Sequence, residues 1–386
     1  MFTVESINGC VIIPTYNNQN TLKRVIDGVL EIVPKHAVII VNDGSTDKTE
    51  EILKEYASDL VILKNDPNAG KGLALRKGFK KAFELGFENA ITIDSDGQHF
   101  PSDIPLLIEK AIEHKGAVIM GSRNMQQDGV PQKSSFGNKF SNFWFKIETG
   151  ISLPDTQTGF RIYPLKPISK MHLFTKKFEL EIEVIVRLAW RRVKFVPVSI
   201  QVKYDPNERV SHFRPGRDFF RISVLNSVLV FFALIYYYPK KFFSFQTLAH
   251  IKQEAVKPNE TNLKKALSIG FGFFMGIFPI WGFQLLIGIP LAMLFRLNKV
   301  LFITAANISI PPMIPFIIYS SLLTGQLFVS GEVHYSSVLD FSSKEVQSNI
   351  YQYFVGAILL SVFAFFAGFI VTFGLLTIFR KNPVKE

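Results

Sequence analysis

The feature that most constrains the fold of this 386-residue chain is a set of long uncharged segments in its C-terminal part. Four stretches beyond residue 221 contain no Asp, Glu, Lys or Arg, and they cover residues 222–239, 266–295, 300–331 and 346–379. The last three exceed the roughly 20 residues that a helix needs to cross a hydrocarbon core, whereas the first is of marginal length. We therefore predict that this part of the chain folds as helices in a lipid bilayer.

Charge divides the chain into regions that suit different solvents. Residues 1–221 contain 31 Lys and Arg with 26 Asp and Glu, whereas residues 222–386 contain only 12 and 6. We predict a soluble domain over residues 1–221, a juxtamembrane interfacial helix and basic linker over 222–265, and a helical transmembrane domain over 266–386. Prolines at positions 290, 311, 312 and 315 predict interrupted helices, one of them broken or re-entrant.

Basic residues beside the apolar segments indicate how the chain is placed. Six lysines lie within residues 240–265, and the tail carries Arg380, Lys381 and Lys385. Both groups favour the cytoplasmic side under the positive-inside rule. We predict a multi-pass protein of the cytoplasmic membrane whose N-terminal domain faces the cytosol. The single cysteine, Cys10, excludes an intrachain disulfide and agrees with a reducing compartment.

The net charge of +11 raises the question of a nucleic-acid partner. The sequence has no run of Lys and Arg and no nucleic-acid-binding motif. Its basic residues gather instead where anionic lipid headgroups would attract them. We therefore predict a membrane partner and no nucleic acid.

The first 120 residues alternate between two kinds of apolar pattern. Short β-branched runs occupy residues 10–13, 37–41, 60–63, 90–93 and 117–120. Between them, residues 21–33, 47–58, 72–85 and 102–114 carry apolar side chains at helical spacing. Strands that alternate with helices form βαβ units, so we predict an α/β domain with a mainly parallel sheet flanked by helices. Ligands bind such sheets beyond the carboxyl ends of the strands.

Two carboxylates follow the strand predicted over residues 90–93. Asp94 and Asp96 flank a single serine, and Gln98 offers a third oxygen. This oxygen set suits Mg²⁺ or Mn²⁺. Such an ion neutralises a diphosphate and helps it to depart as a leaving group. The structural alternative, a turn with two exposed aspartates, is disfavoured by the position at a strand end.

Four motifs occur in order along this domain, namely Val11-Ile-Ile-Pro-Thr-Tyr-Asn17, Val41-Asn-Asp-Gly-Ser-Thr-Asp47, Asn68-Ala-Gly-Lys-Gly-Leu-Ala-Leu-Arg76 and Ile91-Thr-Ile-Asp-Ser-Asp-Gly-Gln-His99. Together they resemble the family 2 glycosyltransferases of GT-A fold, in the branch that contains dolichol- and polyprenyl-phosphate sugar synthases. The resemblance covers residues 8–221, and four ordered motifs are far more specific than any one of them. It implies a GT-A fold, a UDP- or GDP-type sugar donor and a lipid-phosphate acceptor.

The resemblance implies that residues from three of these motifs bind the donor. The nucleotide-sugar candidates are Pro14, Thr15, Tyr16, Asp43, Lys71 and Asp94. An aspartate such as Asp43 accepts hydrogen bonds from a base or ribose, although its Asp-Gly-Ser segment also suits a tight turn. Lys71 opens a predicted helix, where N–H groups and an ammonium would face phosphate. The plain alternative is a loop-to-helix turn with a solvated lysine. Where many relatives carry Glu, this chain has Asn18.

The resemblance assigns two further segments to the acceptor. In Asp155-Thr-Gln-Thr-Gly-Phe-Arg161, Asp155 would orient or deprotonate the acceptor, and Arg161 would grip phosphate bidentately. Arg123 is a second candidate for a phosphate clamp. The juxtamembrane segment 211–221 adds phosphate-binding candidates, which are His212, Arg214 and Arg221. Membrane anchoring by Arg217 and Arg221 is the alternative there.

The C-terminal region resembles a second family. Gly270-Phe-Gly-Phe-Phe-Met-Gly-Ile-Phe-Pro279, Trp281-Gly-Phe-Gln284, Arg296-Leu-Asn298 and the Pro311-Pro312 turn resemble an uncharacterised membrane domain that is often fused to these transferases. Its glycines predict close helix packing.

We predict an inverting, divalent-metal-dependent glycosyltransferase on the cytoplasmic membrane face that moves a sugar from a nucleotide donor to polyprenyl phosphate. Its catalytic candidates are Asp96, Asp155, Arg161 and Arg123. One alternative is transfer to a hydroxyl of diacylglycerol or a polysaccharide, which would need a true general base. The other is a lipid-binding or lipid-translocating membrane protein whose transferase domain serves recruitment only.

Overall fold

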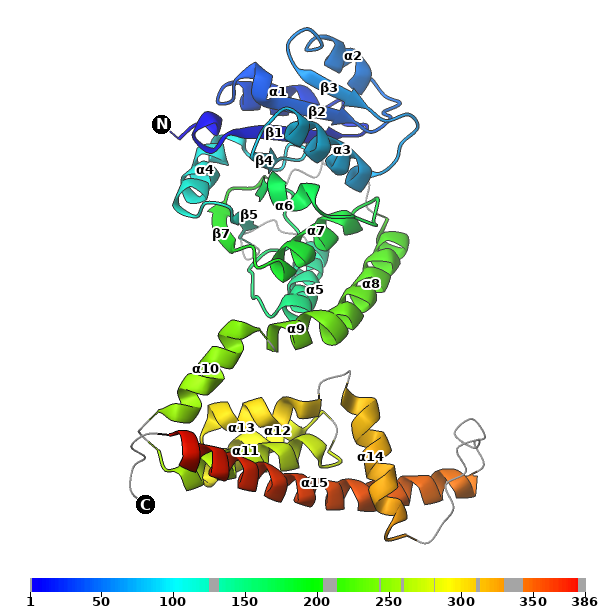
Figure 1. Cartoon of the computed structure of the whole chain (residues 1–386). Coiled ribbons are helices and arrows are strands. Elements are labelled where there is room, and N and C mark those ends of the chain that lie inside the picture. The colour runs from blue at the N-terminus through cyan, green and yellow to red at the C-terminus, as the bar shows by residue number, and fades with distance from the viewer. Residues whose placement is uncertain are drawn as a thin grey trace. The chain divides into compact units, whose positions relative to one another are not determined.

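The computed structural model describes residues 2–124, 132–203, 214–242, 244–257, 260–280, 282–309, 313–329 and 343–380. The chain divides into two compact units, Met1–Phe231 (unit 1) and Phe232–Glu386 (unit 2), whose elements are labelled in Figure 1. The division falls inside the juxtamembrane region that the sequence predicts over residues 222–265.

The described part of unit 1 contains a seven-stranded sheet in the order β3-β2-β1-β4-β6-β5-β7. The strands are β1 Gly9–Thr15, β2 Val38–Asn42, β3 Val61–Lys64, β4 Asn89–Thr92, β5 Val118–Arg123, β6 Arg161–Pro164 and β7 Phe195–Ile200. β6 runs antiparallel to β4 and β5, and the other pairs are parallel. All residues of β1 and β2 are buried, as is typical of β-branched strands covered on both faces. The predicted mainly parallel sheet is confirmed, with β6 and β7 as additions to it.

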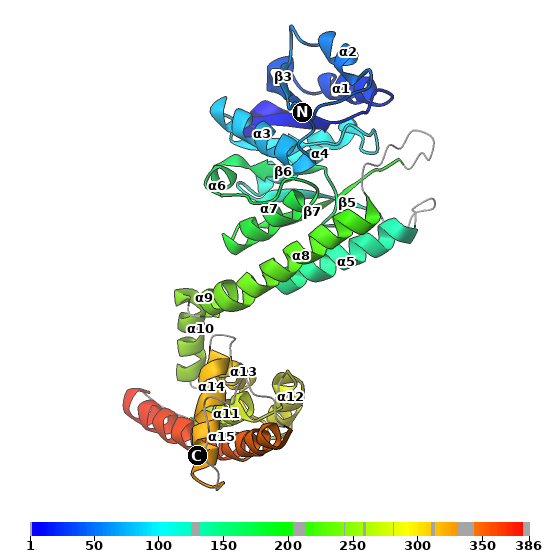
Figure 2. The same ribbon diagram turned by 90° about the vertical axis from the view of Figure 1, so that its right-hand side faces the viewer.

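Helices flank this sheet (Figure 1). They are α1 Leu22–Leu30, α2 Thr49–Lys54, α3 Lys71–Glu84, α4 Ile104–Glu113, α5 Gln132–Thr149, α6 Leu165–Ser169, α7 Glu179–Trp190 and α8 Pro215–Phe232. The apolar face of each of the first four matches a segment that the helical spacing predicts. Figure 2 shows α5 and α8 running alongside each other, and the rings of Phe140 and Phe219 join them with centroids 4.9 Å apart.

The described part of unit 2 is helical. After a π-helical turn over Ala233–Tyr237, its helices are α9 Tyr238–Phe242, α10 Phe245–Val256, α11 Asn262–Ile277, α12 Gln284–Leu294, α13 Lys299–Ala306, α14 Ile314–Gln326 and α15 Ser343–Phe379. The predicted close packing is seen where α11 meets α13. A Cβ atom at Gly272 would lie only 2.6 Å from the Ala305 Cβ and from the Phe302 carbonyl oxygen. Glycine is therefore required for this approach of the two helices.

Two helices in the described ranges are long and apolar enough to cross a membrane, Gly216–Lys241 and Ile350–Phe379. The pair Lys299–Ser309 and Ile314–Gln326, bent by 80° at a short break, adds a third if it counts as one span. These assignments rest on length and composition. The bend agrees with the predicted broken segment, although Pro311 and Pro312 lie outside the described residues.

The uncharged stretch 266–295 is long enough for one spanning helix but is divided into two helices. α11 ends at Ile277 and α12 begins at Gln284. Phe278 has extended backbone (ψ 135°). It precedes Pro279, and the ring of a proline disfavours helical backbone at the residue before it. A lack of charge alone therefore does not show whether a segment is one continuous helix. Pro290, in contrast, lies inside α12 without ending it.

Candidate active site

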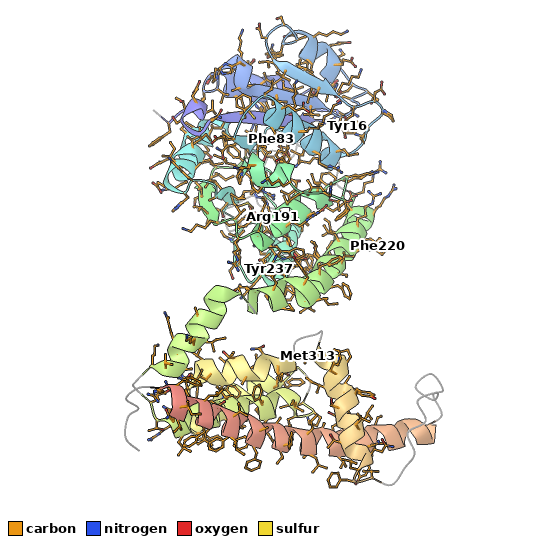
Figure 3. The ribbon with its side chains drawn as sticks, viewed as in Figure 1. Tyr16, Phe83, Arg191, Phe220, Tyr237 and Met313 are labelled. Atoms are coloured by element: carbon orange, nitrogen blue, oxygen red, sulfur yellow. The ribbon has the colours of Figure 1, made fainter. Side chains whose placement is uncertain are left out.

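A cavity of about 460 Å³ opens in unit 1 beyond the carboxyl ends of β1, β2 and β4. These parallel neighbours end at one edge of the sheet, so residues far apart in sequence meet there. Most of the predicted site residues line the cavity, namely Pro14, Thr15, Tyr16, Asp43, Lys71, Asp94, Asp96, Arg214 and Arg221. Figure 3 labels Tyr16, which follows the end of β1.

Lys71 is tied to two carboxylates at this cavity. Its Nζ lies 2.8 Å from Asp94 Oδ1 and 3.1 Å from Glu181 Oε2. Burial alone would lower the pKa of Lys71, but Asp94 and Glu181 raise it above its usual value. Burial would raise the pKa of Asp94, and Lys71 holds it below its usual value. The site therefore presents an ammonium and a carboxylate that both stay charged near neutral pH.

Asp43 holds the start of α3 in place. Its carboxylate accepts hydrogen bonds from Asn65 Nδ2 (2.8 Å) and from the backbone N–H groups of Ala69 (3.0 Å) and Gly70 (2.8 Å). Gly70 has a φ of +99°, and a Cβ there would lie 2.9 Å from the Lys176 carbonyl oxygen. This geometry places Lys71, the first residue of α3, at the cavity. Asp43 thus holds the turn before α3 as well as lining the cavity.

The Asp94-Ser95-Asp96 segment is anchored by its serine. Ser95 Oγ donates to the Pro14 carbonyl oxygen (3.0 Å) and accepts from Asn18 Nδ2 (2.6 Å). Thr21 Oγ1 donates to the Ser95 carbonyl oxygen (2.6 Å). The amide of Asn18 therefore supports the loop that carries both aspartates. The sequence flagged Asn18 only as a departure from the family pattern.

The two aspartates suit a divalent cation that takes further ligands from a substrate. Asp94 and Asp96 line the same cavity, and Asp96 Oδ1 also accepts from the Gln98 backbone N–H (3.1 Å). Within the described ranges, no group of three or more His, Cys, Asp or Glu side chains is placed to hold a metal. Mg²⁺ binds through one or two carboxylates together with substrate phosphates, so two carboxylates fit that ion. Gln98, the third predicted ligand, is buried and does not line the cavity.

Arg123 and Asp155 form a buried ion pair rather than two separate site groups. Arg123 Nε and Nη2 donate to Asp155 Oδ2 (2.7 Å) and Oδ1 (3.0 Å), and Asn138 Nδ2 donates to Oδ1 (2.7 Å). Burial would raise the pKa of Asp155, but Arg123 holds it below its usual value. Neither residue lines the cavity. An aspartate paired in this way does not fit the role of general base. Arg123, the proposed phosphate clamp, is likewise already paired with Asp155.

Arg161 is placed differently from the prediction. The side chain is fully buried at the start of β6, where Nη1 donates to the Tyr163 hydroxyl (2.6 Å) and Nη2 to the Thr156 carbonyl oxygen (2.9 Å). It does not line the cavity. A guanidinium enclosed by protein acceptors has no access to a phosphate in that cavity. We therefore correct the predicted clamp and assign Arg161 to the support of the 155–161 segment.

The α8 end of unit 1 brings further arginines to the cavity. Arg214, Arg217 and Arg221 all line it, together with Asp218, whose carboxylate accepts from the Arg214 backbone N–H (2.7 Å). His212 lies outside the described residues. Sequence reasoning missed Asn68, Lys177 and Phe178 as lining residues. Asn68 opens the third of the quoted motifs, whereas Lys177 and Phe178 come from a loop that only the tertiary fold brings to α3, so no local pattern marked these two.

Two family models match separate parts of the chain. Residues 10–171 match the family described as glycosyl transferase family 2. Residues 246–384 match the family described as an uncharacterized protein conserved in bacteria (DUF2062). The two matches correspond to the two resemblances in the sequence.

Curated relatives align with the N-terminal half. The UDP-N-acetylglucosamine–dolichyl-phosphate N-acetylglucosaminyltransferase of Methanococcus voltae is 31% identical over 215 residues, covering 50% of this chain and 85% of that protein. The polyprenol monophosphomannose synthase of Mycolicibacterium smegmatis is 27% identical and covers 51% of this chain and 77% of that protein. Among solved structures, glucosyl-3-phosphoglycerate synthase from Mycobacterium tuberculosis, in complex with Mn²⁺ and UDP-glucose, is 17% identical with a TM-score of 0.43. That alignment covers 58% of this chain and 78% of that one.

Proposed function

The chain belongs to glycosyl transferase family 2, and from this premise we propose that it is a membrane-bound, inverting transferase that moves a sugar from a UDP- or GDP-type donor to polyprenyl phosphate. One observation carries the proposal. A single cavity is lined both by the paired carboxylates Asp94 and Asp96 and by the arginines Arg214, Arg217 and Arg221. The first set suits a diphosphate with its cation, and the second suits another phosphate.

The donor would lie across the strand ends. Pro14, Thr15 and Tyr16 line the cavity at the carboxyl end of β1, and the Thr15 hydroxyl is buried without a partner among the described residues. Lys71 and the N-terminus of α3 face the same space, where they would attract the diphosphate. Asp94 and Asp96 would hold Mg²⁺ or Mn²⁺. When bound, such an ion neutralises charge that develops on the departing nucleoside diphosphate.

The acceptor would bring its own nucleophile. A phosphate monoester carries about −1.5 to −2 charge at pH 7, so its oxygen needs no deprotonation. That oxygen would attack the anomeric carbon, and the bond to the diphosphate would break with the electron pair leaving on the nucleoside diphosphate. Attack from the opposite side inverts the anomeric centre. A hydroxyl acceptor would need a base, and Asp155 is already engaged by Arg123.

The membrane placement rests on the two candidate spans and the basic segment 240–265. We propose that the cavity faces the cytosol, where nucleotide sugars would reach it. The recruitment-only alternative loses support because the carboxylates, the lysine and the arginines of a working site all line one cavity.

A product assay tests this function. Membranes that contain the full chain are incubated with polyprenyl phosphate and a panel of labelled UDP- and GDP-sugars. We expect one donor to give a lipid-extractable product whose sugar is joined through phosphate, as mass spectrometry would identify it. If no donor in the panel gives a labelled lipid, even where the donor is consumed, the proposal is contradicted.

A further inference from the structure

Helix α5 has two faces of opposite character. Phe136, Phe140, Phe143 and Ile147 recur at helical spacing along its outer face. Phe136 is 65% exposed, Phe143 is 56% exposed and Ile147 is 40% exposed. A soluble domain rarely leaves such a continuous apolar surface uncovered without a binding role for it. We call these four residues the outer face of α5. Their exposure indicates that this face binds a partner.

The residues beside the outer face indicate the chemistry of that occupant. Lys139 and Lys146 are exposed and lie along one edge of it. The indole of Trp144 packs against Phe140 and Phe143, with ring centroids 6.1 Å and 5.4 Å apart. An apolar stripe with aromatic residues, edged by lysines that reach outward, is typical of a helix that lies in a membrane interface.

The outer face continues onto α8 through the Phe140–Phe219 contact. On α8, Phe220, Val224, Val228 and Phe231 are exposed at the spacing of one helix face. Figure 3 places Phe220 on this helix. The same residues belong to the candidate membrane span Gly216–Lys241. The apolar surface of α5 is thus continuous with a helix that is itself suited to lipid.

The inner face of α5 holds the segment that carries Asp155. Asn138 Nδ2 donates to Asp155 Oδ1 (2.7 Å), and Asn142 Nδ2 donates to the Pro154 carbonyl oxygen (2.8 Å). Asn142 Oδ1 accepts from the Thr156 backbone N–H (2.9 Å). One helix therefore connects the outer face directly to the loop of the Arg123–Asp155 pair.

We propose that the outer face of α5 docks on an anionic lipid bilayer. Its continuity with the candidate span and the lysines along its edge select lipid over a protein partner. Through Asn138 and Asn142, the bilayer then also fixes the position of the 154–156 segment, which would lie near the lipid acceptor. That last consequence rests on the proposed function, whereas the docking itself does not.

A spin label on α5 tests the docking in the full chain. The protein is reconstituted into vesicles of phosphatidylcholine and phosphatidylglycerol, with a nitroxide attached at Phe143→Cys. Phe83→Cys is the matched control, because Phe83 is also an exposed phenylalanine but lies on α3 (Figure 3). Burial raises the pKa of the Cys10 thiol to about 12, so the native cysteine does not compete for the label.

We expect the label at position 143 to collide more with oxygen, and several-fold less with a water-soluble nickel complex, than the label at position 83. Nickel access equal to that at position 83 would overturn the proposal, because the face would be in water. Low access to both reagents would also overturn it, because protein would then cover the face. Ile147→Cys repeats the measurement at a second site. No step of the test requires sugar transfer, so its failure is distinct from a failure of the proposed function.

Discussion

Charged groups serve different purposes in the two units. In unit 1, Lys71 and Asp94 pair beside a cavity that both of them line. In unit 2, the buried Lys265 donates all its hydrogen bonds to backbone carbonyl oxygens near the end of α10, those of Glu254 (2.9 Å), Ala255 (2.8 Å) and Lys257 (2.7 Å). A helix C-terminus leaves such carbonyl groups without partners, so a lysine there completes the fold.

The comparison extends to the arginines. Arg380 of unit 2 is buried and donates to Asn262 Oδ1 (2.6 Å) and to the Lys257 carbonyl oxygen (2.6 Å). Arg214 and Arg217 of unit 1 are exposed and line the cavity. Buried charge by itself therefore does not mark a reactive site. What distinguishes unit 1 is charge that borders an open volume large enough for a substrate.

The largest expected effect is at Asp96. Asp96→Ala should lower transfer by about 100-fold or more, because a group that stabilises developing charge is lost at the site. Chelation of divalent ions should abolish transfer, and Mg²⁺ or Mn²⁺ should restore it. Asp59→Ala, at an exposed aspartate, is the control and should leave the rate unchanged. Full activity of the Asp96→Ala variant would show that Asp96 does not hold a metal ion that transfer requires.

The structural half of the comparison is tested at Lys265. Lys265→Met should lower the stability of unit 2 by about 1.5–3 kcal/mol, because charged hydrogen bonds to three carbonyl groups are lost. Lys264→Met changes a neighbouring surface ion pair with Glu260 and should cost at most about 1 kcal/mol. Thermal unfolding in detergent compares the two variants. Equal midpoints would show that Lys265 does not support the fold.

Arg214→Ala should weaken the use of the acceptor while sparing the donor. The loss of one charge-assisted contact to phosphate should raise the KM for polyprenyl phosphate about tenfold. Donor binding, measured by calorimetry, should be unchanged. Arg191→Ala is the control, since Arg191 is exposed after α7 (Figure 3) and does not line the cavity. If Arg214→Ala changes only the affinity for the donor, Arg214 binds the donor and not the acceptor.

The last prediction concerns Glu148 on the inner face of α5. Both carboxyl oxygens are buried without partners among the described residues, and burial raises the pKa of Glu148 to about 8. The unfolded chain releases this proton near the ordinary pKa of about 4.3, so stability should fall as pH rises from there to about 8 and then level off. Glu148→Gln should flatten that slope, and the exposed control Glu88→Gln should keep it. Melting midpoints across this pH range decide between the two outcomes.

Much of unit 1 could be predicted because its strands are short and apolar, and β1 and β2 are buried on both faces. The runs that predict β1 to β5 also locate the strand ends, and hence Asp43, Asp94 and Asp96. β6 was missed because it begins with Arg161, whose burial depends on Tyr163 and on the Thr156 carbonyl oxygen. β7 was missed because Pro197 interrupts its pattern.

The errors in the site have a common physical cause. The motif identified Arg161 as a cation near the acceptor, but only tertiary packing decides whether its guanidinium faces the cavity or the core. The same holds for Lys177, which a loop brings to Gly70. In unit 2, the lack of charge over residues 266–295 did not show where a helix ends, because the break after α11 depends on Pro279.

The central claim is that the acceptor is a lipid phosphate, and one paired measurement tests it most directly. The full chain in vesicles is given its donor with either polyprenyl phosphate or the matching polyprenol, which differs only by the phosphate. We predict transfer to the phosphate and none to the alcohol, because arginines for a phosphate line the cavity, whereas Asp155, the predicted base, is paired with Arg123 and does not line it. Equal transfer to both lipids, or transfer to polyprenol alone, would contradict this account.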